Sequence, residues 1–245
     1  MKCELTFTTG HTIEKRDFRP IFVFNIVINT VLILSNRIAT ILSVIFHPLI
    51  LTTYLFAILF LVTPDLVGVS ALELPAIGSL LLLLFLNTFI APSLVIYYMY
   101  KFGVTTTLQV ENLDERRLPY IASIILYAIA TYLFGWKLQQ IGELAPQISI
   151  LLASATISLI LIFVISLFWK ISAHATGFGG MLGTLICLLV RFDEALLLYP
   201  FLLAVIITGL VMSARLYLNA HTPAQVLAGL AGGLLVSSTT VILFL

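Results

Sequence analysis

Charged residues are scarce in this 245-residue chain, because Lys, Arg, Asp and Glu together supply only 9% of it. An average soluble domain has about 25%. So few charged side chains cannot cover the surface of a water-soluble fold of this length, and we therefore exclude a soluble globular protein. The net charge of +1 gives no sign of the basic surface that nucleic-acid-binding proteins need, so we expect no nucleic-acid partner.

Cysteine is equally scarce. Cys3 lies at the amino terminus and Cys187 inside an apolar run, which argues against a disulfide framework. The polar segments also lack His, Asp and Glu residues at the spacing of metal ligands. We therefore expect neither a metal ion nor another cofactor.

Long apolar runs are abundant: 61% of the residues are hydrophobic and the mean hydropathy is +1.16. A helix needs about 20 apolar residues to cross a bilayer. Each predicted span is an uncharged run bounded by charged or turn-forming residues. There are seven such runs: residues 38–64, 74–100, 120–136, 145–169, 171–190, 195–214 and 222–245.

These runs predict an all-α fold, a polytopic transmembrane helical bundle that crosses the cell membrane several times, because a backbone in hydrocarbon must satisfy its own hydrogen bonds. The bundle forms one domain over residues 38–245, after an amino-terminal tail of residues 1–37. An eighth run, residues 20–36, can span the membrane, lie in its interface or act as an uncleaved signal anchor. We interpret Pro48, inside the first run, as a feature of helix packing.

Three polar segments are expected to meet on one face of the membrane. If the spans cross alternately, residues 101–119, 170–177 and 213–221 all lie on the same side. They contain most of the basic and titratable side chains outside the tail. Ionisable residues at a membrane edge are costly, which makes these segments candidates for a functional site.

His221 opens the last apolar run and follows Arg215 by six residues. A neutral imidazole can attack phosphorus, while a guanidinium binds the non-bridging oxygens. The alternative is a histidine near a helix cap, beside an arginine that extends to lipid headgroups. His174 can act as a second acid or base, since an imidazole titrates near pH ~6.5, or it can be a hydrogen-bonded structural residue.

Arg116 and Arg117 form a cationic pair just before the third predicted span. Phosphate is a natural partner for such a pair. The alternative is that both residues fix the membrane topology and pair with Asp114 and Glu115. His47 has no charged companion nearby in the sequence, and we interpret it as structural.

Together these segments resemble three motifs of the type 2 phosphatidic acid phosphatase superfamily: Lys-x6-Arg-Pro, Pro-Ser-Gly-His and Ser-Arg-x5-His-x3-Asp. Arg215 and His221 keep the spacing of the third motif, although Gln225 stands where the motif has Asp. Ile171-Ser172-Ala173-His174 keeps the Ser and His of the second. Arg117-Leu118-Pro119 resembles the first, with one residue inserted and without its lysine.

The resemblance implies a six-helix phosphatase core with one or two additional helices, and a lipid phosphatase that needs no metal. It implies that His221 attacks the phosphoryl group to form a phosphohistidine. His174 would protonate the leaving lipid alkoxide and later activate water, while Arg215 and Arg117 would neutralise the phosphoryl oxygens. Further phosphate contacts are expected from Arg116, Ser172 and Ala173. Lys170 is added because it is close to the second motif. Gln225 is expected to orient His221.

The expected substrate is a phosphorylated lipid, since the site lies at the membrane edge of a chain without a soluble domain. Phosphatidate, phosphatidylglycerophosphate and polyprenyl diphosphates all fit. A second hypothesis is a lipid head-group phosphotransferase, which uses the same site but replaces water with an alcohol acceptor. A third is a catalytically silent membrane protein, which the altered first motif favours. Besides the bilayer and the lipid, a second copy of the chain is a conceivable partner.

Overall fold

The computed structural model describes residues 36–70, 72–108, 113–137 and 146–245, which belong to one compact unit. Within these ranges the chain is helical and contains no strand. The predicted all-α class is therefore confirmed. The predicted tail and the eighth apolar run lie outside the described residues, apart from residues 36 and 37, which begin the first described helix.

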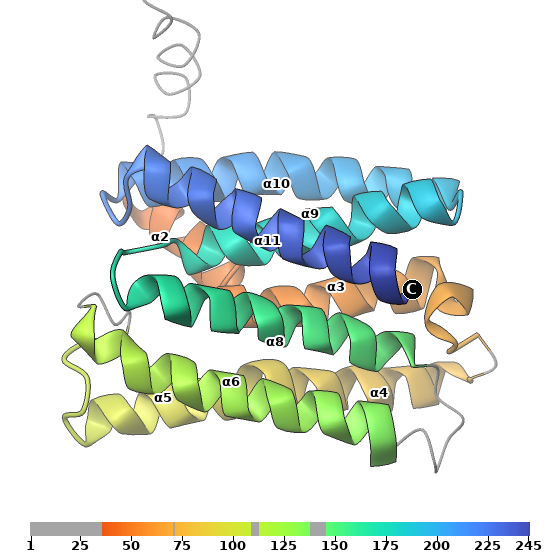
Figure 1. Cartoon of the computed structure of the whole chain (residues 1–245), viewed down its shortest axis with the longest axis horizontal. Coiled ribbons are helices and arrows are strands. Elements are labelled where there is room, and N and C mark those ends of the chain that lie inside the picture. The colour runs from red at the N-terminus through yellow and green to blue at the C-terminus, as the bar shows by residue number, and fades with distance from the viewer. Residues whose placement is uncertain (1–35, 71, 109–112, 138–145) are drawn as a thin grey trace, which may run out of the picture. The chain divides into compact units, whose positions relative to one another are not determined.

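The helices run side by side, up and down, and are joined at their ends by short connections (Figure 1). Several of them are preceded, connected or extended by short helical turns: Pro64–Val67, Leu86–Ile90, Asp114–Arg116, Leu133–Lys137 and Ala195–Leu197. The main helices are α2 (Asn36–Ile45), α3 (Pro48–Val62), α4 (Leu74–Phe85), α5 (Ala91–Lys101), α6 (Arg117–Tyr132), α8 (Gln147–Ser166), α9 (Ala173–Arg191), α10 (Leu198–Tyr217) and α11 (Pro223–Phe244).

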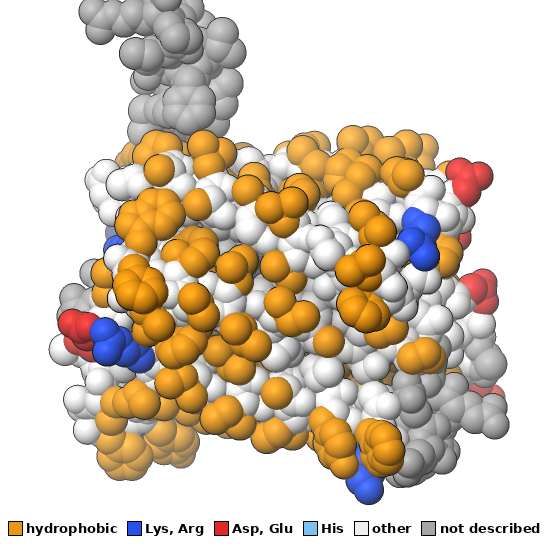
Figure 2. Space-filling model, viewed as in Figure 1, with side chains coloured by type: hydrophobic (Ala, Val, Ile, Leu, Met, Phe, Trp, Pro, Cys, Tyr) orange, Lys and Arg blue, Asp and Glu red, His pale blue; other side chains and the backbone are white. Residues whose placement is uncertain are grey.

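Six helical stretches of the described residues are long and apolar enough to cross a membrane, and α2 with α3 makes a seventh if that bent pair is one span. Figure 2 shows hydrophobic side chains over the middle of the helices on one face, with the visible charged side chains towards the two ends. Large apolar side chains such as Leu203, Ile206 and Leu235 are more than half exposed. Exposed apolar surface on this scale is typical of a multi-pass membrane protein.

The first predicted span is bent, which the sequence did not predict. Its two halves, α2 and α3, meet at 58°. Pro48 is the first residue of α3 and has no backbone N–H to continue a helix from α2. His47 forms the N-cap of α3, and its Nδ1 accepts a hydrogen bond from the Leu49 N–H at 3.4 Å. Pro48 therefore separates two helices and is more than a feature of their packing.

Helices α9 and α11 approach each other most closely, through glycines on both sides. A Cβ on Gly233 would overlap the carbonyl of Thr176, and a Cβ on Gly179 would overlap the carbonyl of Leu230. Small residues of this kind let membrane helices bring their backbones together. Helix α10, which separates α9 and α11 in the sequence, runs in the opposite direction to both. Since α9 and α11 therefore point the same way, their N-termini lie at the same end of the bundle.

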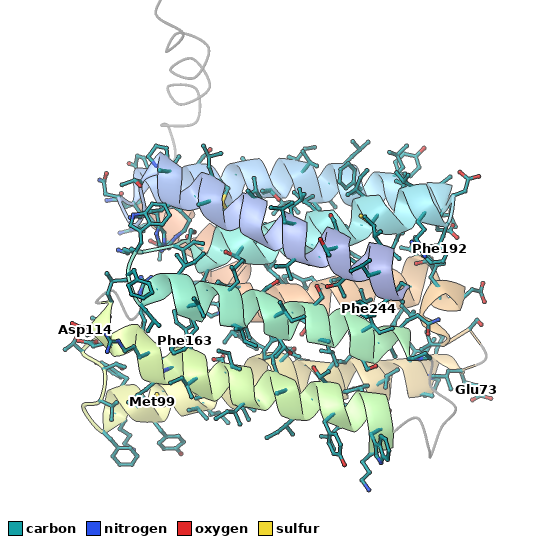
Figure 3. All side chains as sticks on the ribbon, in the orientation of Figure 1. Glu73, Met99, Asp114, Phe163, Phe192 and Phe244 are labelled. Atoms are coloured by element: carbon teal, nitrogen blue, oxygen red, sulfur yellow. The ribbon has the colours of Figure 1, made fainter. Side chains whose placement is uncertain are left out.

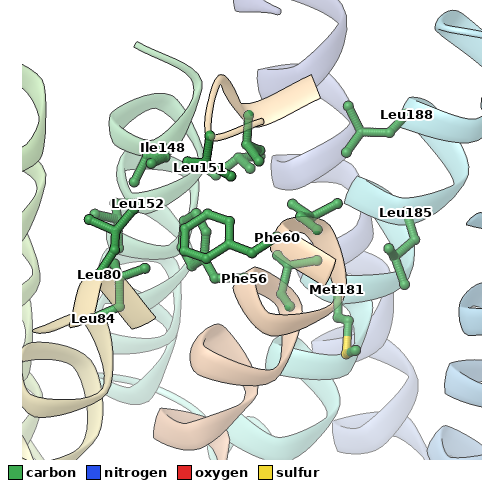
Figure 4. Close-up of a cluster of buried hydrophobic side chains, with 14 of the residues drawn as sticks. Phe56, Phe60, Leu80, Leu84, Ile148, Leu151, Leu152, Met181, Leu185 and Leu188 are labelled. Carbon is green, nitrogen blue, oxygen red and sulfur yellow. The ribbon is translucent and has the colours of Figure 1, made fainter. Parts of the chain in front are cut away.

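The opposite half of the bundle is filled by a cluster of buried hydrophobic side chains (Figure 4). Phe56 and Phe60 of α3 lie at its centre, with ring centroids 5.7 Å apart. Leu84 of α4, Leu152 of α8 and Leu185 of α9 pack around them and are fully buried. Helix α3 is thus packed on several sides by other helices.

Adding a methyl group between α9 and α11 should destabilise the fold. We expect Gly233→Ala to lower the free energy of unfolding by about 1–3 kcal/mol, because the new Cβ meets backbone that cannot rotate away. Gly209→Ala on α10 is the matched control, since its Cβ would meet nothing within 4 Å. The test is the melting temperature in detergent. Equal melting temperatures for the two variants would contradict the close contact between α9 and α11.

Candidate functional site

Four connections gather at one end of the bundle, the left-hand end in Figure 1: α2 to α3, α5 to α6, α8 to α9 and α10 to α11. Asp114 lies at this end and Glu73 at the opposite one (Figure 3). The three polar segments predicted to share a face are therefore brought together. The α2–α3 bend joins them as a fourth segment.

His221 is held in one tautomer by the start of α11. Thr222 and Gln225 form a capping box, in which the Thr222 N–H donates to Gln225 Oε1 at 3.1 Å. The same Oε1 lies 3.3 Å from His221 Nδ1. Because this oxygen can only accept, His221 Nδ1 carries the proton and Nε2 keeps its lone pair. An amide oxygen thus orients the imidazole at the position where the resembling motif has a carboxylate.

The charge around His221 favours its neutral form. Burial lowers the pKa of His221 to about 4, and the nearby cations Arg215, Arg116 and Lys170 contribute to this lowering. The three cations come from the last turn of α10, the α5–α6 connection and the α8–α9 connection, so the fold gathers them around one imidazole. A neutral, cation-surrounded imidazole with a free Nε2 is suited to attack an anionic electrophile.

His174 lies in the first turn of α9, 8% exposed. Its Nε2 is 3.0 Å from the backbone carbonyl of Ser43 in α2. A carbonyl can only accept, so Nε2 carries a proton and Nδ1 is the atom that can gain or release one. The positive charge of Arg215 acts on His174, and so does that of His221 when it is protonated, which places the three side chains in one site.

The two neighbouring arginines point in different directions. Arg116 is 8% exposed, and its side chain hydrogen-bonds the phenol of Tyr120. Arg117 has a side chain that is 55% exposed and forms an ion pair with Asp114 at 3.3 Å. Adjacent residues at the start of a helix project about 100° apart, so only one of them can face the bundle. Of the two, Arg116 is the one whose charge acts on His221. The expected phosphate contacts of Arg116 and Arg117 remain predictions.

Ser172 and Ala173 serve the fold at this end. The Ser172 hydroxyl caps α9 by accepting a hydrogen bond from the Ala175 N–H at 3.4 Å. The Ser172 N–H donates to the Gln225 carbonyl at 3.4 Å, which ties the start of α9 to the start of α11. Ala173 lines a cavity of about 70 Å³ between α3, α8 and α9. The expected phosphate contacts of both residues remain predictions.

His47 is the site residue that the sequence interpretation missed. Its ring lies 5.9 Å from the ring of His174, centroid to centroid, at 75°. The charge of Arg215 also acts on it. The sequence signal was the His-Pro pair itself, which marks a helix start and hence a bend at the level of the other connections. The three histidines belong to no group of His, Cys, Asp or Glu able to hold a metal ion in the described part of the chain.

The arrangement is suited to an anion. Arg215, Arg116 and Lys170 provide positive charge around His221, and the N-termini of α9 and α11 add the positive ends of two helix dipoles. A neutral nucleophilic imidazole and a second imidazole with an exchangeable proton lie among these groups. This combination can carry out nucleophilic displacement at a phosphoryl group.

Comparison of the chain with family models, with curated proteins and with solved structures finds no match.

The tautomer of His221 can be read by NMR of isotope-labelled histidine in detergent. At about pH 7 we expect a neutral ring with its proton on Nδ1. Gln225→Glu keeps the capping box but places a negative charge beside Nδ1, so it should raise the pKa of His221 above its lowered value. Gln147→Glu, the same change at the start of α8, should leave it unaltered. A proton on Nε2 in the wild type would contradict the orientation by Gln225.

Proposed function

We propose that this protein is an integral membrane lipid phosphatase that works through a phosphohistidine on His221. The observation that carries the proposal is the meeting of His174, at the start of α9, with Arg215 and His221, around the α10–α11 connection. His221 Nδ1 is bound to Gln225, and among the described residues no hydrogen bond involves its Nε2. The motif resemblance supports the same assignment. Six helices long and apolar enough to cross a membrane support a place in the cell membrane.

In the first step, His221 Nε2 attacks phosphorus. A P–N bond forms, and the bond from phosphorus to the lipid oxygen breaks. His174 Nδ1 gives its proton to the departing alkoxide, which is a strong base and leaves poorly without one. The negative charge of the bound phosphoryl group favours protonation of His174 before this step.

In the second step, water attacks the phosphorus of the phosphohistidine. His174 Nδ1, now unprotonated, accepts a proton from this water, the P–N bond breaks, and phosphate leaves. The two steps sum to hydrolysis of a phosphate ester to an alcohol and phosphate. His221 and His174 both return to their starting forms, so the reaction needs only the ester and water and no oxidant.

Arg215, Arg116 and Lys170 are assigned to the phosphoryl oxygens. Their positive charge gains value as charge develops on these oxygens in the transition state. A planar guanidinium can bind two oxygens at once, which an ammonium cannot. Arg116 takes the place that the sequence interpretation gave to Arg117, because Arg116 is buried beside His221 and Arg117 is paired with Asp114.

The substrate class follows from the position of the site at one end of the apolar helices. There a lipid can keep its chains in the bilayer while its phosphate reaches the cations. Phosphatidate, phosphatidylglycerophosphate and polyprenyl diphosphates share this layout. In each of them a terminal phosphoryl group is attached to a leaving group, an alkoxide or a phosphate, that a lipid chain anchors in the membrane.

Detergent-purified protein should release phosphate from one or more of these lipids. We expect vanadate to inhibit, because it mimics five-coordinate phosphorus, and EDTA to have no effect. His221→Ala is the inactive control. Activity lost in EDTA and restored by a divalent ion would contradict the metal-free mechanism. Formation of a phosphate monoester of an added alcohol, in place of free phosphate, would instead identify a phosphotransferase.

The two neighbouring arginines provide a matched test of the site. Arg116→Gln should lower kcat/KM by about 10²–10³-fold, because it removes a buried cation from the phosphoryl group. Arg117→Gln should change it by less than about fivefold, since this side chain is exposed and paired with Asp114. Melting temperatures of both variants control for folding. A larger loss of kcat/KM in Arg117→Gln than in Arg116→Gln would contradict the assignment of Arg116 to the phosphoryl oxygens.

A further inference from the structure

The ring of His174 is held by two contacts from one short segment. The Ser43 carbonyl accepts the hydrogen bond from His174 Nε2, and the ring of His47 lies against the His174 ring at 5.9 Å and 75°. Ser43 belongs to the last turns of α2, and His47 is the N-cap of α3. The bend between these helices thus presents both contacts to the start of α9.

His47 is itself fixed on two further sides. Its Nδ1 accepts the Leu49 N–H at 3.4 Å, so its neutral ring carries the proton on Nε2. Phe89 lies on another side, with ring centroids 6.3 Å apart at 66°. Phe89 comes from the π-helical turn Leu86–Ile90, and such turns frequently occur at functional sites.

The hydrogen bond to Leu49 also decides which histidine can exchange a proton. A second proton on His47 would have to go to Nδ1 and would displace the Leu49 N–H from it. His174 keeps Nδ1 available, because its contact with Ser43 uses Nε2. His47 is therefore suited to hold a neighbouring ring and not to compete with it for the proton.

We propose that His47 is a positioning residue for the acid–base group His174: with the Ser43 carbonyl it fixes the His174 ring so that Nδ1 is directed to the leaving oxygen. This inference rests on the proposed function. It gives the bent α2–α3 pair a role in catalysis, because both contacts to His174 come from this bend. Misplacement of a catalytic group by about 1 Å can lower a rate by about 10²-fold.

Two substitutions separate this role from simple helix capping. His47→Asn keeps an N-cap acceptor for α3, since asparagine is among the best N-cap residues, but removes the ring. His47→Ala removes both. If His47 only caps α3, His47→Asn should match the wild type and His47→Ala alone should be impaired. If His47 positions His174, both variants should be impaired.

The experiment measures phosphate release from a lipid monoester and the nitrophenol burst from nitrophenyl phosphate. His47→Asn should lower kcat on the lipid by about 10-fold to 100-fold with little change in KM. The burst should fall much less, because nitrophenolate leaves without a proton. In a His174→Ala background, His47→Asn should cause no further loss. Melting temperatures show whether each variant is folded.

The outcomes distinguish the inference from the function on which it rests. A wild-type protein that releases no phosphate from any lipid contradicts the proposed function, and the inference fails with it. An active wild type with an unimpaired His47→Asn variant contradicts the inference alone. So does a loss from His47→Asn that is equal on lipid and aryl substrates, or one that is undiminished in the His174→Ala background.

Discussion

The direct backbone contact between α9 and α11 is the constraint on which the candidate site depends. Gly179 and Gly233 have no side-chain carbon, so the backbones of the two helices come so close that a Cβ at either position would overlap the facing backbone. Because α9 and α11 point the same way, this contact fixes their N-termini side by side, and the Ser172 N–H to Gln225 carbonyl hydrogen bond joins them. His174 in the first turn of α9 and His221 just before α11 are therefore held together by helices, which are stiffer than loops.

The membrane-spanning helices that hold the site could be predicted in outline from the sequence. Apolar runs and their charged borders indicated the spans, since a helix in hydrocarbon must be long and uncharged. The spacing of Arg215 and His221, with alternate crossing, indicated which connections share a side. Six of the seven predicted spans correspond to long apolar helices of the described chain.

The sequence could not show in which direction neighbouring side chains point or how far a helix bends. Arg116 and Arg117 are chemically identical neighbours, and only the angle at which α6 begins decides that Arg116 is buried and Arg117 is exposed. His47 appeared isolated because its partner, His174, is far away in the sequence, and the 58° bend that brings them together depends on how α3 packs. The His-Pro pair marks a helix start, but no local pattern shows which distant residue the bend brings to His47.

The most direct measurement is to trap the covalent intermediate. Protein incubated with a radiophosphate-labelled lipid monoester and quenched in alkaline detergent should carry label with the behaviour of a phosphohistidine, which survives alkali and is lost in acid. With labelled nitrophenyl phosphate, whose leaving group needs no proton, the label should accumulate in His174→Ala, because its water attack is slow. With either substrate the label should be absent from His221→Ala. Turnover with label that survives acid, or label retained in His221→Ala, would contradict the assignment of His221 as the nucleophile.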